Sequence, residues 1–473
     1  MTDTSPILLW FRRDLRLSDH PALTEAARSG RPVIPVFLCD EVVEGQGAAP
    51  RFRLEKSVAS LAADLDGKGS RLILRRGEAL AMLRTLIEET GAGAVWWTRL
   101  YDPASRKRDE AVKAALKEDG VDARSFPGHV LFEPWTVETG SGGFYKVFTP
   151  MWKSVRGRDP GDPLPTPGKI PAPDEWPESD SLESWCLSKD MRRGADVVSQ
   201  YLTVGESAAS SRLGAFIAHK IDAYAEARDI PAVDGTSRLS ENLTYGEISA
   251  RTCWHAGRRA MEEGKKGAET FLKELVWREF AYHLVHHTPR IVSDNWREEW
   301  DAFPWNEDER LKEVIAWKRG RTGMEFVDAA MREMYVTGTM HNRGRMIVAS
   351  YLTKHLLCHW KIGLKWFEDH LIDWDPASNA MGWQWSAGSG PDATPYFRVF
   401  NPVTQVEKFD RDGAYRRKWI AEGRGSPTKT ALSYFDAIPQ SWSMSPSDPY
   451  PEPVVGADTG RKRALEAYEN RDF

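Results

Sequence analysis

Short apolar runs alternate with helical patterns over the first 126 residues, and this alternation is the strongest constraint on the fold of the chain. The apolar runs occupy residues 7–11, 33–39, 71–75, 94–98 and 124–126. Helical patterns separate them at 21–28, 53–66, 79–89 and 105–118. Strands that alternate with helices at this spacing indicate a parallel sheet covered on both faces. We therefore predict an α/β, Rossmann-like domain over residues 1–132.

The rest of the chain changes character twice. Residues 133–205 are rich in Pro, Gly, Ser and Trp, which predicts a long connector laid against the protein surface. Residues 206–473 have a helical period, with the clearest helices expected at 208–228, 269–287, 325–336, 343–360 and 365–372. A chain of 473 residues is long enough for two or three domains. We predict an all-α C-terminal domain joined to the α/β domain by this connector.

Composition narrows the classes of function. The net charge of -5 gives no global signal for nucleic-acid binding, so such binding needs a local basic face. Residues 408–429 supply seven basic and three acidic side chains, which fits a phosphate-facing rim or ordinary solvated surface. The four cysteines lack C-x-x-C spacing, so we expect no zinc site, no disulfide framework and no metal. No apolar run approaches the roughly 18 residues of a membrane span, so we expect a cytoplasmic protein that does not bind membranes.

The loops that follow the predicted strands lack phosphate-binding signatures. Neither G-x-G-x-x-G nor a Walker loop occurs there, so the chemistry of dinucleotide and nucleotide enzymes is not indicated. The stretch FRRDLRL, residues 11–17, is interpreted as a surface ion-pair network at a strand exit. Open parallel sheets bind ligands beyond the carboxyl ends of their strands, which points to the loops after Phe11, Cys39 and Thr98.

The segment DWDPASNAMGWQW, residues 373–385, has the composition of a binding site. Carboxylates, an amide and indoles are costly to bury unless a bound group satisfies them or stacks on them. If the segment is helical, Trp383 and Trp385 lie about 200° apart around the helix axis, whereas Asn379 and Trp383 share a face. The two indoles of this one segment would then face two different cavities. The alternative is a buried turn with two core aromatics and solvated aspartates.

Three further segments concentrate polar side chains. In GTSRLSENL, which begins at residue 235, hydroxyls beside Arg238 suit either a phosphate group or a plain helix cap. In FLKELVWREF, residues 271–280, Glu274, Trp277 and Arg278 share one helical face, and a surface Glu274–Arg278 ion pair is the alternative. In MHNRGRMI, residues 340–347, the donors suit a buried polar ligand or a DNA backbone.

Five motifs in chain order closely resemble the photolyase and cryptochrome family of flavoproteins. They are WFRRDLRLSDHPAL, GTSRLS, FLKELVWREF, MHNRGRMI and DWDPASNAMGWQWSAGSGPDATPYFRVFNP. The resemblance extends from Trp10 to about Tyr468. It implies an antenna domain, a connector, and a helical domain that holds FAD folded into a U. It also implies roles for individual residues, which are carried over position by position.

The resemblance implies a flavin pocket. Its FAD-phosphate cradle corresponds to Tyr224, Thr236, Ser237, Arg238, Leu239 and Ser240, and the rest of the pocket to Glu274, Arg278, Asn342, Arg345, Asp373, Asp375 and Asn379. Asn379 occupies the position that faces flavin N5, where plant cryptochromes carry aspartate and animal cryptochromes cysteine. A neutral amide tolerates the reduced anionic flavin, whereas a nearby carboxylate would repel that anion or take up a proton.

The resemblance also implies a DNA-lesion cavity and an electron relay. Trp277 and Trp385 match the indoles that clamp a flipped pyrimidine dimer; Glu274, Asn342, Arg343 and Met346 line the cavity, and Arg398 lies near the DNA phosphates. Met346 stands where photolyases specific for 6-4 lesions carry histidine, which indicates a cyclobutane dimer as substrate. The relay that reduces the flavin corresponds to Trp383, Trp360 and Trp305, with Trp300 and Trp317 as neighbours of the last.

The predicted activity is therefore light-dependent repair of cyclobutane pyrimidine dimers in DNA by a monomer. Excited reduced FAD would donate an electron to the dimer, and a protonated or water-bridged Glu274 would stabilise the resulting radical anion. The alternatives are a photosensory cryptochrome without repair activity and a helical interaction protein with surplus tryptophans.

One position at which this sequence differs from other family members bears on the antenna chromophore. Ser105 stands where folate-binding members of the best-known bacterial group carry glutamate, and residues 101–109 look more like plant cryptochromes. We therefore expect the bacterial class III group close to plant cryptochromes, with 5,10-methenyltetrahydrofolate as the antenna. An 8-hydroxy-deazaflavin or no antenna is the alternative.

Overall fold

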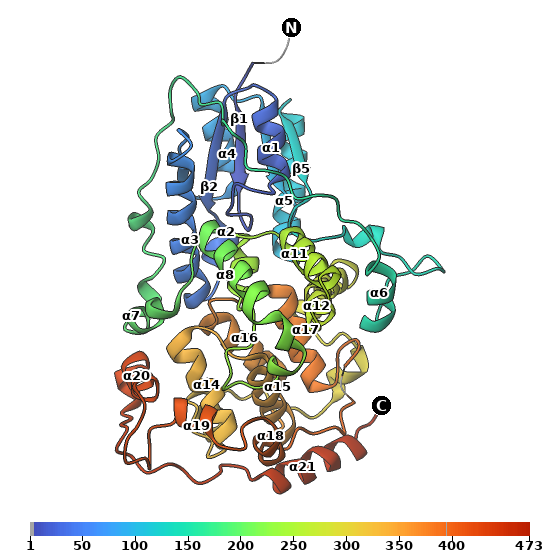
Figure 1. Cartoon of the computed structure of the whole chain (residues 1–473), viewed down its shortest axis with the longest axis vertical. Helices are drawn as coiled ribbons and strands as arrows, with labels where there is room; N and C mark the ends of the chain where they lie inside the picture. The colour runs from blue at the N-terminus through green and yellow to red at the C-terminus, as the bar shows by residue number, and fades with distance from the viewer. Residues whose placement is uncertain (1–3, 394) are drawn as a thin grey trace.

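A five-stranded parallel sheet forms the N-terminal part of the computed structural model, which describes residues 4–393 and 395–473 (Figure 1). The strand order is β3-β2-β1-β4-β5, with β1 at Ile7–Phe11, β2 at Val33–Cys39, β3 at Ile73–Arg76, β4 at Ala94–Thr98 and β5 at Asp122–Phe126. Helices α1 (Pro21–Arg28) and α3 (Ala48–Asp66) cover one face, and α4 (Ala79–Thr90) and α5 (Pro103–Glu118) cover the other. The predicted α/β class is confirmed, because strands buried on both faces read as continuous apolar runs.

The stretch 11–17 corrects one expectation, because its charged side chains are buried. Arg12 and Arg16 are 6% and 1% exposed, and Asp14 is 1% exposed. Arg12 donates to the carbonyl of Thr98 and, at 2.9 Å, to Asp109, whereas Arg16 donates to backbone carbonyls of the loop after β5 and of the helical half. The surface interpretation is wrong because these side chains are buried, and because Arg12 and Arg16 each have partners more than 80 residues away in sequence. The stretch joins the two halves of the molecule.

Residues 133–205, predicted as the connector, run past the α/β domain (Figure 1). They include α6 (Phe148–Val155) on one side of the molecule and α7 (Gly194–Val198) on the other (Figure 1). Between them, the amide of Asp180 donates to the carbonyl of Leu74 at 2.9 Å, and the hydroxyl of Ser179 accepts from the amide of Leu74. These bonds cover the free edge of β3, which would otherwise present unpaired backbone groups.

The C-terminal half is helical, but two expected helices are interrupted. The range 208–228 contains α8 (Glu206–His219), a short 3₁₀ turn and α9 (Tyr224–Ala227), because Ile221 turns into the core. The range 343–360 contains α15 (Asn342–Ser350) and a π-helical turn (Tyr351–His355). The chain then leaves the helix at Leu357, which has a φ of 56°, and α16 (Trp360–His370) begins anew with His359 as its cap. Helices α12 (Ala268–His287) and α14 (Glu325–Thr337) closely match their expected ranges.

Helix α17 (Pro376–Ala387) lies at the centre of the helical half and packs against α12, α15 and α16. Its sequence explains both ends: Asp375 caps the first turn by accepting from the amide of Ser378 at 2.8 Å, and Gly388 ends the helix in the left-handed conformation. The segment is helical, which is the condition under which its two indoles face different ways. The boundaries predicted for the three domains stay a prediction.

Candidate functional site

The two indoles of α17 have different surroundings, as the helix period predicted. Trp383 is 2% exposed and lies directly on Gly363 of α16, where any side chain would collide with its ring. Trp385 is half-buried and stacks on Phe400, with ring centroids 6.5 Å apart and an interplanar angle of 23°. The core interpretation holds for Trp383 but not for Trp385, so α17 separates a buried side from an accessible one.

Acidic side chains at the start of α17 are held by arginine and tyrosine. Arg345 donates to both oxygens of Asp373, at 2.8 and 2.9 Å. Asp375 accepts from the hydroxyl of Tyr282, and Arg13 lies 3.6 Å from the same oxygen. Four of these five residues come from α12, α15 and the α17 entry, so the fold brings distant polar groups to one end of the helix. Asp373 and Asp375 are each less than 10% exposed.

Two residues of α17 are open to solvent. Gly382 is exposed although it lies on a central helix, and a side-chain carbon placed there would meet no atom within 4 Å. Asn379 is half-exposed and donates one amide hydrogen to the carbonyl of Leu364 at 3.1 Å. Its carbonyl oxygen and remaining hydrogen can meet a heteroaromatic edge, which fits the isoalloxazine of FAD.

The predicted phosphate cradle is a loop that leads into α10 (Ser240–Tyr245). Arg238 has a φ of 53°, and its guanidinium is exposed beside Asp234 at 3.1 Å. The carbonyl of Arg238 accepts from Arg212 at 2.6 Å, which fixes the turn. Thr236 and Ser237 are half-exposed, Ser240 is exposed and Leu239 is buried, so the hydroxyls are available to a ligand. Tyr224 is buried and packs edge-on against Phe271.

Arg278 makes its polar contacts with the loop after β5 and with its own helix, and not with Glu274. Its guanidinium donates to the carbonyl of His129 at 2.9 Å and lies beside Glu279 of its own helix. It also covers the ring of Tyr282, at 5.0 Å. Sequence spacing placed Arg278 on the face of Glu274, but the two side chains have different partners here. Arg278 contacts the site indirectly, because it covers the ring of Tyr282, whose hydroxyl donates to Asp375.

The residues predicted to line the lesion cavity are joined through two adjacent residues at the end of α9. Arg228 pairs with Glu274 of α12 at 2.5 Å, and Asp229 pairs with Arg343 of α15 at 2.5 Å. The guanidinium of Arg343 also lies 4.2 Å from the ring centroid of Phe409. Burial raises the pKa of Glu274, and the neighbouring guanidinium of Arg228 opposes that shift. The surface Glu274–Arg278 pair is therefore not formed.

Two lesion-side residues lie at the start of α15. The amide nitrogen of Asn342 is 4.0 Å from the sulfur of Met346, and Arg343 approaches the same sulfur at 3.8 Å. Asn342 is exposed and Met346 is half-exposed, so both are accessible from solvent. The structure thus brings Glu274, Asn342, Arg343 and Met346 to one region.

Sequence reasoning missed two residues of this region, Phe148 and Arg228. Phe148, at the start of α6, stacks on Trp277 with a centroid distance of 3.8 Å and an interplanar angle of 4°. The backbone amide of Phe148 also donates to the carboxylate of Asp392, in the loop after α17, at 3.2 Å. No local signal marks Phe148, because it lies in the connector. Arg228 could have been suspected only from its charge beside the cradle sequence.

Two of the predicted relay residues, Trp305 and Trp360, are bridged by a histidine ring. The ring of His359 lies between Trp305 and Trp360, with both centroid distances 5.3 Å. Trp360 is fully buried and donates to Asn295 at 2.8 Å. Trp300 stacks on Trp305 at 5.6 Å, and Trp317 meets Trp383 edge-on at 6.1 Å. Both neighbours noted in the sequence therefore contact relay candidates.

The basic rim is only partly available to DNA. Arg416 is bound by Asp410 and Glu325, and Arg424 lies 4.0 Å from Glu325. The exposed cations are Arg398, Lys408, Arg411, Arg417 and Lys429. The excess of positive charge that faces solvent therefore comes mainly from the outer residues of the segment.

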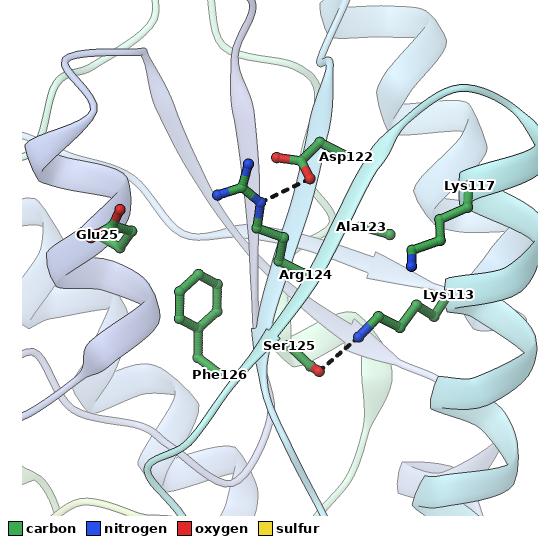
Figure 2. Close-up of a pocket in the computed structure, with 8 residues that line it drawn as sticks. All are labelled: Glu25, Lys113, Lys117, Asp122, Ala123, Arg124, Ser125 and Phe126. Atoms are coloured by element: carbon green, nitrogen blue, oxygen red, sulfur yellow. Dashed lines mark hydrogen bonds and ion pairs between the residues drawn. The ribbon is translucent and has the colours of Figure 1, made fainter.

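Two hollows lie outside the site. One, of about 510 Å³, lies where the α/β domain meets the α17 entry, and Trp374, Arg13, Ser105, Asp102 and Glu41 are among its lining residues. The other, of about 410 Å³, runs along edge strand β5 between α1 and α5 (Figure 2). Figure 2 shows Lys113 bonded to Ser125 and Arg124 bonded to Asp122 in this second hollow. None of the predicted site residues lines it.

Within residues 4–393 and 395–473, no group of three or more His, Cys, Asp or Glu side chains is arranged to hold a metal ion. Among the helices of the same described part, none is long and apolar enough to cross a bilayer.

The fold and the polar groups around α17 define a two-part protein, in which an α/β domain is joined to a helical half whose central helix carries buried carboxylates, an amide and two indoles. Residues 7–169 match the family described as DNA photolyase, and residues 271–470 match the FAD binding domain of DNA photolyase. The chain belongs to the photolyase and cryptochrome family.

Three similar proteins illustrate this membership. The deoxyribodipyrimidine photo-lyase of Agrobacterium fabrum is 45% identical over 470 residues, which cover 98% of each chain. Cryptochrome-1 of Arabidopsis thaliana is 33% identical over 97% of this chain and 70% of its own length. A crystal structure of a bacterial class III photolyase from Agrobacterium tumefaciens matches 99% of this chain and 98% of its own, with 44% identity and a TM-score of 0.91. The family expected from the five motifs is confirmed.

Proposed function

We propose that this protein repairs cyclobutane pyrimidine dimers in DNA when it absorbs light. The observation that carries the proposal is the division made by α17: the half-exposed amide of Asn379 shares a face with the buried Trp383, and an accessible indole, Trp385, lies on another face of the same helix. FAD, when reduced and excited by light, supplies the electron that splits the dimer. The similarity to proteins named deoxyribodipyrimidine photo-lyase supports this reading over a purely sensory role.

The chain contributes binding and positioning on the flavin side. Asn379, Asp373 with Arg345, and Asp375 would meet the polar edges of FAD, and the hydroxyl-rich loop 236–240 would meet its phosphates. The neutral amide of Asn379 permits an anionic reduced flavin beside it. Buried ion pairs hold the carboxylates in place, so the pocket is ordered before the cofactor binds.

On the lesion side, Trp277 and Trp385 would stack on the flipped dimer. Flipping costs a few kcal/mol, and less for a lesion because its stacking is already disturbed. Glu274 would hold the dimer by a hydrogen bond. Because Arg228 competes for this carboxylate, Glu274 either exchanges partners when DNA binds or reaches the dimer through its second oxygen. Arg398 and the exposed cations of 408–429 would hold the flanking phosphates.

The relay is proposed to run from Trp383 through Trp360 to Trp305. The short ring-to-ring distances through His359 support its outer part. It would deliver the electrons that bring oxidised FAD to its reduced state.

For the antenna we propose a methenyl-folate in the hollow of about 510 Å³ beside Trp374. A flat pterin can stack on this indole, and Glu41 and Asp102 can accept from its N–H groups. Trp374 lies between Asp373 and Asp375, so an antenna at this place would lie close to the flavin. Mass spectrometry of the chromophores released from purified protein tests this point; a deazaflavin would contradict it.

The protein is proposed to act as a monomer in the cytoplasm. The four cysteines are unpaired, as in proteins of reducing compartments.

The direct test is an irradiation assay. Chemically reduced protein and an oligonucleotide with one thymine dimer are exposed to blue light, and the dimer is quantified by chromatography. We expect loss of the dimer in the light and none in the dark. Persistence of the dimer in the light would contradict the proposal and favour a photosensory cryptochrome.

A further inference from the structure

A lysine is buried beneath the loop that carries Arg398. Lys354 is 0% exposed and lies in the π-helical turn Tyr351–His355, which continues α15. Its ammonium donates to the backbone carbonyl of Arg398 at 3.0 Å and lies 5.5 Å from the ring centroid of Tyr396. Buried lysines are rare because dehydration of the ammonium is costly, and π-helical turns are frequent at functional sites. Packing alone does not account for this residue.

The segment that Lys354 binds is part of the lesion side. Residues 395–400 follow α17 and end at Phe400, whose ring stacks on Trp385. The hydroxyl of Ser350, also next to the π-helical turn, accepts from the amide of Phe400 at 3.4 Å. Lys354 therefore holds the segment at Arg398, and Ser350 holds it two residues further on, at Phe400. Arg398 and Trp385, both expected to touch damaged DNA, depend on how this segment sits.

We propose that Lys354 is a positioning residue for lesion recognition: its buried ammonium fastens the segment 395–400 to α15, and thereby sets Arg398 and the Phe400 support of Trp385 for a flipped dimer. The inference rests on the proposed repair function. It adds to that function a residue that touches neither flavin nor DNA.

Protonation controls how strong this fastening is. Burial lowers the pKa of Lys354 to about 7, so the charge is lost as the pH rises through neutrality. A charged donor makes a hydrogen bond roughly twice as strong as a neutral one. The titratable or charged groups on the elements packed there include Tyr351 and His355 on the same turn, Tyr396 and Arg398 on the segment, and Arg463 of α21 (Ala457–Glu469), which donates to the carbonyl of His355. None of these five is an acid that would favour the charged lysine.

The same burial makes the stability of the fold change with pH in the opposite direction to the strength of this hydrogen bond. The pKa of Lys354 is lower in the folded than in the unfolded chain, so below about pH 7 the folded state carries a dehydrated charge that the unfolded state does not. Stability therefore rises with pH as this charge is lost. If Lys354 positions the segment, a neutral residue in its place should weaken dimer binding without lowering the stability of the fold. If its role is purely structural, the same residue should lower that stability.

The test compares the wild type with Lys354→Met and with Lys462→Met, an exposed lysine of α21 that serves as the matched control. Dark binding to a duplex with one thymine dimer, and to the same undamaged duplex, is measured by fluorescence anisotropy at about pH 6.5 and about pH 8.5. At the lower pH we expect Lys354→Met to bind the dimer about tenfold more weakly than the wild type, with unchanged binding of undamaged DNA. At the higher pH the affinity of the wild type for the dimer should fall to nearly that of Lys354→Met. The affinity of Lys354→Met should be the same at both pH values.

Thermal unfolding and flavin content complete the test. At about pH 6.5 the Tm of Lys354→Met should equal or exceed that of the wild type, and FAD per protein should be unchanged. Equal dimer affinity in the wild type and Lys354→Met would overturn the inference, and so would a lower Tm of the variant at both pH values. A wild type that does not prefer the dimer at either pH would instead count against the proposed repair function.

Discussion

At the scale of single residues, Glu274 has a partner that its sequence neighbours did not reveal. Arg228 holds it at 2.5 Å, while burial raises its pKa. Glu274→Leu removes the hydrogen bond that we propose to the dimer and frees Arg228. We expect repair under blue light to slow by at least about tenfold, because a preorganised hydrogen bond to developing charge is lost. The rate is measured with chemically reduced enzyme.

Glu269→Leu is the matched control, since Glu269 lies on the same helix and pairs only with the exposed Lys273 in the described structure. It should repair at the wild-type rate. Equal repair by both variants, or a loss of FAD from Glu274→Leu that accounts for the whole effect, would argue against a role in repair.

Trp360 tests the relay at the same scale. Trp360→Phe keeps an aromatic ring but loses the bond to Asn295, at a stability cost of about 1 kcal/mol. We expect photoreduction of oxidised FAD to stop and repair by chemically reduced enzyme to remain, because the relay serves only the reduction. Flavin absorbance during illumination follows the first step. Trp185→Phe, a buried indole of the connector, should photoreduce normally; a slow Trp185→Phe or a fast Trp360→Phe would refute the assignment.

At the scale of elements, local sequence predicted helices and strands well where their cause is local. Helix α17 is an example, because its cap, its proline and its terminal glycine all lie within the segment. The break at 351–359 could not be predicted, since the residues there have ordinary helical character and the chain leaves the helix for tertiary reasons. Lys354 owes its burial to that break. The stacking of Phe148 on Trp277 was hidden for the same reason, since it joins the connector to α12.

Helix α6 of the connector is therefore expected to shape the lesion cavity. Phe148→Ala removes the ring that supports Trp277. We expect dimer affinity to fall about fivefold, which corresponds to the roughly 1 kcal/mol of an aromatic pair. Anisotropy with the dimer duplex measures this. Val147→Ala, an exposed neighbour, should bind as the wild type does; a similar loss in both variants would mean that α6 itself has been disturbed.

At the scale of the whole molecule, a buried ion network joins the α/β domain to the phosphate cradle. Arg53 of α3 binds Glu241 at 2.9 Å and Glu247 at 2.7 Å, and Glu241 in turn binds Arg212, which holds the carbonyl of Arg238. Arg53→Met leaves the buried Glu247 without its ion-pair partner and leaves Glu241 paired with Arg212 alone. We expect it to lower the free energy of unfolding by about 3 to 5 kcal/mol and to weaken FAD binding.

Arg51→Met is its control, because Arg51 lies on the same helix and pairs with the exposed Asp190. Its effect should stay below about 1 kcal/mol. Urea unfolding and reconstitution with FAD provide the two readouts. Equal effects of the two substitutions would show that the network does not couple the domains.

Long-range order of this kind limits what sequence can predict. The stretch FRRDLRL looked like surface charge because its partners, Thr98, Asp109 and Gly246, are distant in sequence. The α/β and helical classes follow from periods of a few residues, so they were predictable. The partners of Glu274 and Arg278 depend on how α9, α12 and the loop after β5 meet, which no local pattern contains.

The central claim is that α17 separates a flavin side from a lesion side, and one measurement tests it most directly. Repair of a thymine-dimer duplex by chemically reduced enzyme is compared between Trp383→Phe and Trp385→Ala at low substrate concentration. We expect Trp383→Phe to repair near the wild-type rate, because Trp383 lies on the flavin side. We expect Trp385→Ala to repair at least about tenfold more slowly, because base stacking contributes about 1 to 3 kcal/mol. Equal losses in the two variants, or full repair by Trp385→Ala, would contradict it.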